Sequence, residues 1–268
     1  MNPEFAKKAP VLIVGAHRSG TSATARALKL LGLQIGQKLD SHDEPRELQR
    51  VHETYLHRVG AAWYQPGPFL ASLTIPEGKR ACVEYLRGQI RPDLSVFSYR
   101  KGLTGWRLRR NLRNGSPWGW KEPRTTLFGE CWLEIFPNGR ILHVIRNPLA
   151  VATSIQRREL EFQSKGDEPS GQVQDFNYCV ELAMTYVEVG EALADRTSHF
   201  CRVRFEDLQT DTVGQLSKLA EFCGLTVTNR QIQRAAATIR PTRADTLRQV
   251  NEKRDALARY PLAAKLGY

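Results

Sequence analysis

Four short apolar runs along the chain predict buried strands. Val11–Val14 is continuously apolar, as expected for a parallel strand that is covered on both faces. Trp118–Lys121 and Arg140–Ile145 give two further strand signals, and His199–Phe205 alternates between polar and apolar residues. Helical patterns separate these runs, and repeated strand-then-helix units are typical of an α/β fold in which helices cover both faces of a parallel sheet.

Apolar residues recur at helical spacing between and after the predicted strands. The predicted helices run from Thr21 to a cap at Gly32, after Pro45, from Leu149, from Phe176, and from Leu208 to Cys223 before Gly224. The polar and charged tail from Pro241 gives no clear element.

Residues 61–100 interrupt this strand-and-helix order. They mix Pro and Gly with short helical patterns such as Ala81–Ile90, which predicts an insertion outside the core. The whole chain, 268 residues, is the length of a single α/β domain with such an insertion. We therefore expect one domain over residues 1–268, with a helical insertion at about 37–115.

Charge and cysteine usage narrow the class of partner. The formal net charge of +11 favours an anionic partner such as a nucleotide, a nucleic acid or an acidic substrate. The five cysteines are scattered and never form a C-x-x-C pair, which argues against a disulfide framework or a zinc site and for a reducing, cytoplasmic setting. The chain contains no 18-residue apolar run, and its N-terminal residues lack the apolar stretch of roughly 7–15 residues that a secretion signal needs, so we expect no membrane span and no secretion signal.

The loop after the first strand has the features of a phosphate-binding loop. Gly15 and Gly20 frame four residues, as in nucleotide-binding P-loops, but the lysine that follows in those loops is absent and Arg18 lies inside the loop. The start of a helix attracts anions, and the forked guanidinium suits an oxyanion. Three hydroxyls add further donors: Ser19, Thr21 and Ser22. The loop therefore predicts binding of a terminal phosphate-like group.

A second basic group follows the strand Arg140–Ile145. Arg146 comes at the carboxyl end of that strand, where ligands gather in open α/β sheets. Ser154 and Arg158 lie eight and twelve residues further on, which places them on one face of the following helix. These three side chains predict a second phosphate site, so the ligand is expected to carry phosphate at both ends of a nucleoside.

Acidic residues at strand ends, which a magnesium-dependent nucleotide hydrolase needs, are poorly represented. Two strands end in cations, in "GWKEPR" and "HVIRNP", and the third, "VRFEDL", offers Glu206 and Asp207 beyond its apolar stretch. The sequence therefore predicts an anion held by arginines and no metal.

These motifs, in this order, resemble the PAPS-dependent sulfotransferases, especially bacterial members and the tyrosylprotein sulfotransferases. "GAHRSGTS" resembles the 5′-phosphosulfate loop of that family, and "VIRNPLAVATS" resembles its 3′-phosphate motif. "WGWKEPRTTL" resembles the K-[DE]-P stretch, and "VRFEDL" resembles a Y-E-D-L element in which Phe205 replaces the tyrosine. The resemblance implies a P-loop-like three-layer α/β/α fold with a mostly parallel sheet, and an acceptor-side insertion at about 37–115.

The resemblance also implies roles for individual residues. PAPS would be bound by Arg18, Ser19, Gly20, Thr21 and Ser22 at the 5′-phosphosulfate, and by Arg146 and Ser154, assisted by Arg158, at the 3′-phosphate. Lys121 would contact the sulfuryl group, and Phe205 cannot make the hydrogen bond of the family's tyrosine. Transfer to a hydroxyl or amine by in-line displacement would leave adenosine 3′,5′-bisphosphate (PAP), without a metal.

The resemblance places a general base shortly after the first helix. The candidates are His42, Asp43, Glu44 and Glu47 in "SHDEPRE", and we favour Glu44, followed by Glu47 and His42. The predicted catalytic residues are therefore Arg18, Lys121 and Glu44.

Three other interpretations stay open from the sequence: a magnesium-dependent nucleotide kinase or hydrolase, a nucleic-acid-binding module, and a relative that binds the nucleotide without catalysis. The basic stretch Tyr99–Arg113, which contains Trp106, gives the nucleic-acid interpretation its support, although a solvated surface explains it as well. The acceptor could be a glycan, phenol, lipid or peptide. Its recognition is expected in residues 37–115, where Trp63, Tyr64 and Phe69 are candidates, and in the loop Gln163–Asp175.

Overall fold

The computed structural model describes residues 9–36, 39–40, 42–90, 95–97, 106, 110–164, 171–242 and 244–268. The strands are β1 (Val11–Val14), β2 (Gly119–Lys121), β3 (Arg140–Ile145) and β4 (Phe200–Arg204). The α-helices are α1 (Thr21–Leu30), α2 (Arg46–Arg58), α3 (Gly67–Leu73), α4 (Pro76–Gln89), α6 (Gly129–Ile135), α7 (Pro148–Gln163), α8 (Phe176–Ala192), α9 (Phe205–Thr210), α10 (Thr212–Phe222), α11 (Asn229–Ala236), α12 (Ala244–Glu252) and α13 (Pro261–Lys265). Short 3₁₀ helices are η1 (Ser95–Phe97), η2 (Pro123–Thr126), η3 (Gly171–Gln174), η4 (Leu193–Arg196) and η5 (Arg254–Leu257).

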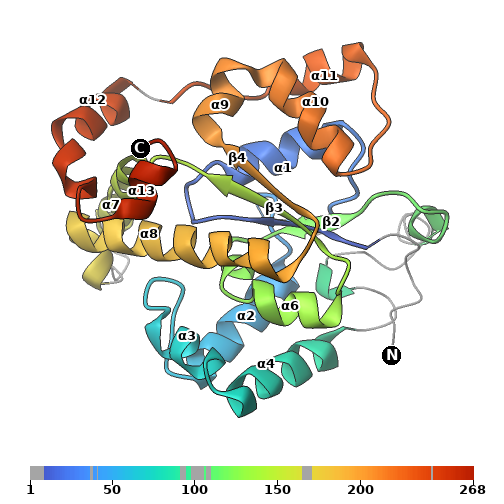
Figure 1. The fold of residues 1–268 in the computed structure, drawn as a ribbon, viewed down its shortest axis with the longest axis horizontal. Coiled ribbons are helices and arrows are strands. Elements are labelled where there is room, and N and C mark those ends of the chain that lie inside the picture. The colour runs from blue at the N-terminus through green and yellow to red at the C-terminus, as the bar shows by residue number, and fades with distance from the viewer. Residues whose placement is uncertain are drawn as a thin grey trace.

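The four strands form one parallel sheet in the order β2-β1-β3-β4, which confirms the predicted α/β fold (Figure 1). Gly119 is needed where β2 meets β1, because a Cβ at that position would lie 1.9 Å from the carbonyl oxygen of Val11. Since all four strands are parallel, their carboxyl ends meet at one edge of the sheet. The residues that follow those ends are therefore brought together.

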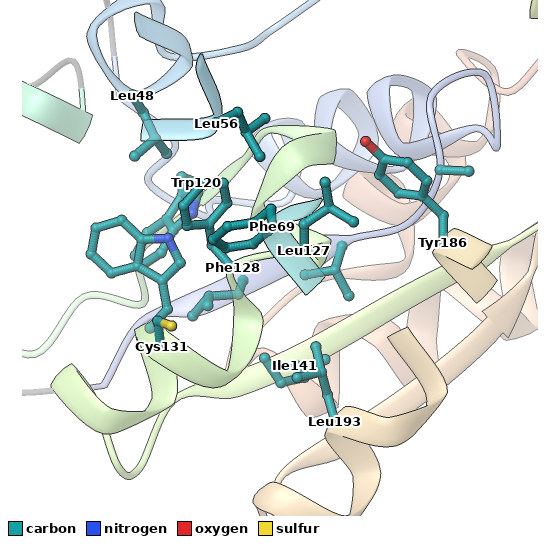
Figure 2. Packing of buried hydrophobic residues seen from close by; sticks show 14 of the residues in the cluster. Leu48, Leu56, Phe69, Trp120, Leu127, Phe128, Cys131, Ile141, Tyr186 and Leu193 are labelled. Carbon is teal, nitrogen blue, oxygen red and sulfur yellow. The ribbon is translucent and has the colours of Figure 1, made fainter. Parts of the chain in front are cut away.

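Helices cover both faces of the sheet, which gives three layers (Figure 1). Val11 and Ile13 face a core shared with α1, α10 and α11, whereas Leu12 and Val14 face the larger core shared with α2, α4, α6 and α8. Figure 2 shows the larger core, in which rings and aliphatic side chains from distant segments meet: Leu48, Phe69, Trp120, Phe128, Ile141 and Tyr186. The alternation along β1 is what a strand buried on both faces requires.

The segment expected as an insertion outside the core is helical but contributes to the core. Phe69 of α3 and Phe97 of η1 are both fully buried, and the Phe97 ring stacks on Trp120 with centroids 4.5 Å apart. The expectation that residues 61–100 lie outside the core is therefore wrong, because helical apolar residues there cover the β2 side of the sheet. Most of the basic stretch Tyr99–Arg113 lies outside the described residues.

The helix predicted over Leu208–Cys223 is two helices. The chain breaks at Asp211, whose carboxylate accepts a hydrogen bond from the Gly214 N–H and so caps α10. The tail beyond Pro241 forms α12, η5 and α13. In the part of the chain that the structure describes, no helix combines the length and apolar character needed to cross a bilayer.

Candidate active site

The loop between β1 and α1 is held in an open curve at the sheet edge. Gly15 N–H donates to Thr126 Oγ1 (2.8 Å), and the same hydroxyl donates to the Gly15 carbonyl (3.1 Å). Arg18 and Gly20 both have positive φ, 69° and 98°. Gly20, the N-cap residue of α1, has no side chain to cap the helix, so the N–H groups at the start of α1 and the positive end of its dipole favour an anion.

Two cavities of about 520 and 450 Å³ adjoin this loop and share Arg18, His42, Arg146, Arg158, Phe205 and Arg240 in their walls. The larger cavity is strongly cationic. Six arginines line it, against two carboxylates, those of Asp40 and Glu44. A cavity with this excess of positive charge favours an anionic ligand.

Arg146 lies at the junction of the two cavities. Its Nη1 donates to the Arg18 carbonyl (3.1 Å), and its Nη2 donates to Thr242 Oγ1 (3.2 Å). Its guanidinium lies over the Phe205 ring, 5.4 Å from the centroid. The strand-end arginine thus joins the loop to the C-terminal segment that follows α11.

The structure brings the two predicted phosphate sites into contact. Arg18 Nε donates to Ser154 Oγ at 2.9 Å, so the loop after β1 meets the face of α7. Arg158, one turn further along α7, lies over Trp63 at 4.9 Å and pairs with Glu159 at 2.8 Å. Arg18 and Arg158 both line the two cavities.

Lys121 is fully buried at the end of β2 and makes three hydrogen bonds. Its Nζ donates to Ser22 Oγ (3.0 Å), to the His42 carbonyl (2.6 Å) and to Glu44 Oε1 (2.6 Å). Gln49 donates to the other oxygen of Glu44 (2.6 Å). Burial raises the pKa of Glu44 above its usual range, although Lys121 opposes this effect.

The other candidates for the base are placed differently. His42 lines both cavities, and its carbonyl holds Lys121. Asp43 pairs with Arg26 at 3.0 Å, and Glu47 pairs with Arg50 on the surface at 2.6 Å. Of the carboxylates in "SHDEPRE", Glu44 is therefore the one that lines the cavity and contacts Lys121.

The Lys-Glu-Pro-Arg stretch at the end of β2 carries a buried charge network that no sequence pattern predicted. Glu122 accepts from His52 Nδ1 and from Arg124 Nη1, both at 2.5 Å. Trp132 donates to His52 Nε2 (3.0 Å), and because an indole only donates, the proton of His52 is on Nδ1. Burial acts to raise the pKa of Glu122, but the neighbouring Arg124 and His52 outweigh it and hold the pKa well below its usual range.

Further residues in the cavity walls were also missed. They are His17, Arg124, Arg240 and Thr242. The motif "GWKEPR" contains Arg124, so the sequence already indicated a cation after that strand. Arg240 and Thr242 gave no signal, because their place depends on a contact between the C-terminal segment and a strand end far away in the sequence.

Phe205, which replaces the tyrosine of the motif that "VRFEDL" resembles, shapes the loop. A Cβ on Gly20 would lie 2.2 Å from this ring, so the ring packs directly on the start of α1. The next residue, Glu206, accepts from the Asn147 N–H (2.9 Å) and from the Tyr268 hydroxyl (2.9 Å). Glu206 thus links the end of β3 to the C-terminal residue through hydrogen bonds. The described residues contain no group of three or more His, Cys, Asp or Glu side chains that could hold a metal ion.

The chemistry of the loop and cavities fits a nucleotide with two anionic ends. Ser19 Oγ is buried without a partner among the described residues, as expected of a donor whose acceptor arrives with a ligand. The start of α1 and the junction formed by Arg146 offer two places for phosphate-like groups. A phosphosulfate at the loop and a second phosphate near Arg146 are compatible with this arrangement.

Comparison with known proteins assigns the family. The family model described as "Sulfotransferase family" matches residues 10–229, and a search of curated proteins gave no match. The fold is similar to that of sulfotransferase STF9 from Mycobacterium avium, at TM-score 0.50 and 15% identity over 94% of this chain and 77% of that one. It is also similar to the sulfotransferase domain from the curacin biosynthetic pathway, at TM-score 0.50 and 13% identity over 92% and 98% of the two chains. Both likenesses confirm the predicted P-loop-like three-layer fold. The family match, which spans most of the chain, shows that this chain belongs to the sulfotransferase family, the PAPS-dependent enzymes that its motifs resemble.

Proposed function

We propose that this enzyme transfers the sulfuryl group of PAPS to an acceptor hydroxyl or amine within one domain, residues 1–268, whose insertion at about 37–115 contributes to the acceptor side. One observation carries the proposal. The loop arginine Arg18 and the strand-end Arg146 meet at the junction of two cationic cavities, and the Lys121–Glu44 pair adjoins the same loop.

The cofactor's two anionic ends would be held by different elements. The loop residues Ser19, Gly20, Thr21 and Ser22 and the open start of α1 would bind the 5′-phosphosulfate, with Arg18 beside them. Arg146, Ser154 and Arg158 would bind the 3′-phosphate, and Arg240 lines the same space. The contact between Arg18 and Ser154 supports two neighbouring anion sites bridged by one nucleoside.

The Lys121–Glu44 pair would handle the proton. PAPS, when bound, supplies the sulfuryl group that the acceptor takes. Glu44 Oε1 and Oε2 each keep a second lone pair beyond the bonds to Lys121 and Gln49, so the carboxylate can accept the acceptor's proton. A positioned base of this kind contributes roughly 10²–10⁴-fold to rate. Once Glu44 is neutral, Lys121 is left to stabilise negative charge that develops nearby.

A reducing, cytoplasmic setting is part of the proposal. The five cysteines are free thiols, and four of them are buried in the fold and not paired as disulfides. Scattered, unpaired cysteines are typical of proteins from reducing compartments.

A thermal-shift panel tests the proposed function. PAP, ATP with Mg²⁺ and GTP with Mg²⁺ are compared at equal concentrations, because a ligand that binds only the native state raises its apparent stability by mass action. We expect PAP to stabilise the protein in the presence of EDTA, and PAPS turnover to be lost in Arg18→Ala and Lys121→Ala. Stabilisation by a triphosphate with Mg²⁺ and none by PAP would favour the kinase interpretation. A steep salt dependence of RNA binding would favour the nucleic-acid interpretation.

A further inference from the structure

Three residues in the wall of the larger cavity carry a buried nitrogen that has no hydrogen-bond partner in the described part of the chain. One is Arg146, through its Nε, and this residue is already placed at the proposed 3′-phosphate site. The other two are His17, through Nε2, and Arg124, through Nε. Buried polar groups in folded proteins are almost always paired, so an unpaired group in a cavity wall calls for an explanation. Neither residue is needed for the cofactor contacts or the proton transfer described above.

The guanidinium of Arg124 is fixed in one orientation. Nη1 donates to Glu122 (2.5 Å) and Nη2 donates to Glu53 (2.6 Å). The side chain is only 9% exposed, and Glu122 is itself fixed by His52. Two of the three guanidinium nitrogens are thus engaged, and the third, Nε, carries an N–H that can only donate.

His17 is fixed by aromatic packing. Its ring lies against Trp63, with centroids 4.5 Å apart, and meets Tyr186 edge-on at 6.1 Å. Burial first, and then the positive charge of Arg124, hold the pKa of His17 well below 6.5, and Arg158 and Lys121 act in the same direction against Glu122. The imidazole is therefore neutral at neutral pH and carries one N–H. An anion in the cavity favours the tautomer that directs this N–H toward it.

The chemistry of the transferred group matches this pair. A sulfuryl group offers oxygen atoms that only accept hydrogen bonds, and His17 and Arg124 line the cavity and each carry a nitrogen that makes no hydrogen bond to any described residue. The Lys121 ammonium cannot serve as the sole donor in this arrangement, because its three protons are already shared by Ser22, His42 and Glu44. His17 adjoins Arg18 in the loop, and Arg124 follows Lys121 by three residues, so both donors belong to the elements that border the phosphosulfate position.

We propose that His17 and Arg124 form a donor pair for the sulfuryl group of PAPS, in addition to the loop and Lys121. The proposal rests on the proposed function. The pair is rigid before the ligand arrives, so little reorganisation is needed to bind the sulfuryl oxygens. It acts on the transferred group and not on the nucleotide.

PAP and PAPS are the matched probes, because they differ only in the sulfuryl group. Calorimetry of both ligands, without any acceptor, measures the ratio of their dissociation constants. His17→Phe keeps an aromatic ring against Trp63 but removes the N–H, and His17→Gln restores an N–H on a side chain of similar reach. We expect His17→Phe to weaken PAPS binding about tenfold, as the loss of a hydrogen bond to a charged group does, with PAP binding unchanged. His17→Gln should recover most of the affinity for PAPS.

Arg124→Lys is the second variant, since it keeps a positive charge for Glu122 and Glu53 but replaces the guanidinium and so removes Nε. It should also weaken PAPS binding without changing PAP binding, and stabilisation by PAP in a thermal shift shows that the variant is folded. If Arg124→Lys does not fold, the His17 variants decide. If the ratio of the PAPS and PAP dissociation constants is unchanged in His17→Phe, the proposal is overturned; this result is expected if His17 and Arg124 donate to a bound water and not to the sulfuryl group. The proposal is also overturned if His17→Gln binds PAPS as weakly as His17→Phe. Failure of the proposed function is distinct, because the unaltered protein would then bind neither ligand.

Discussion

Removing the Lys121 ammonium should expose how the buried Glu44 carboxylate is stabilised. In Lys121→Met, Glu44 Oε1 loses the 2.6 Å ion pair, and the His42 carbonyl loses its 2.6 Å donor. Removing one partner of a buried ion pair typically costs about 3–5 kcal/mol. Glu44 keeps its bond from Gln49, and its side chain is 10% exposed. We therefore expect the lower end of that range, about 3 kcal/mol of unfolding free energy at pH 8.

The loss should depend on pH, with a sign that follows from Glu44. Burial raises the pKa of this carboxyl in the native protein, and loss of Lys121 raises it further. A carboxyl with a raised native pKa binds its proton more tightly in the folded state, so its contribution to stability is fully present below the unfolded pKa, about 4.3. That contribution is lost as pH rises through the native pKa. The deficit of Lys121→Met against the unaltered protein should therefore shrink as pH falls from 8 toward 5.

Urea unfolding followed by tryptophan fluorescence measures this deficit at each pH. The control is a double-mutant cycle that combines Lys121→Met with Glu44→Gln, because a neutral amide at position 44 needs no ammonium to balance its charge. The double variant should recover most of the stability that Lys121→Met loses and should show little of its pH dependence. A deficit that stays constant between pH 5 and 8, or a double variant no more stable than Lys121→Met alone, would refute the assigned coupling.

Three further predictions concern the loop and the anion sites. Arg146→Ala should weaken PAP binding about tenfold or more in calorimetry, since a charge-assisted contact to phosphate contributes about 1.5–3 kcal/mol, while the unfolding midpoint changes little. Glu44→Gln should lower kcat about 10²–10⁴-fold with PAP affinity unchanged, and equal turnover would count against this base. Gly20→Ala should lower the thermal midpoint and weaken PAP binding, because φ at this position is 98° and the new Cβ would meet the Phe205 ring at 2.2 Å; a strained position of this kind costs of order 1–3 kcal/mol. Gly15, whose φ is 145°, stays unaltered in this variant, so a change in PAP affinity measured by calorimetry is due to position 20 alone.

The sheet and the positions of the loop and of Arg146 at its edge could be predicted because their signals are local. Val11–Val14 and Arg140–Ile145 are strands with the predicted bounds, since a continuous apolar run of that length suits a strand covered on both faces. Arg146 and the loop follow those strands directly. In a parallel sheet, the topology then brings them to the same edge without further information.

The parts that could not be predicted depend on contacts between distant segments. The apolar pattern over this segment fits one long helix as well as two. The chain forms two helices because the Asp211 side chain accepts a hydrogen bond from the Gly214 N–H and caps the second helix. The contact between Thr242 and Arg146 joins residues 96 positions apart, and no pattern in the polar tail indicates it. Phe97 is buried because Trp120 offers a ring to stack on, whereas the Pro- and Gly-containing sequence around it suggested a surface insertion.

In the proposed reaction, the surroundings of Arg146 and Lys121 would let one site both hold an anion and move a proton. Within the described segments of the chain, the two hydrogen bonds that Arg146 donates go to neutral oxygens, the Arg18 carbonyl and the Thr242 hydroxyl. Its positive charge is therefore available to a permanent anion such as a phosphate. Lys121 instead donates to the Glu44 carboxylate, which neutralises its charge until that carboxylate takes a proton. A cation that becomes effective only when the base is protonated stabilises the charge of the transition state more than that of the ground state, and this difference is what accelerates a reaction.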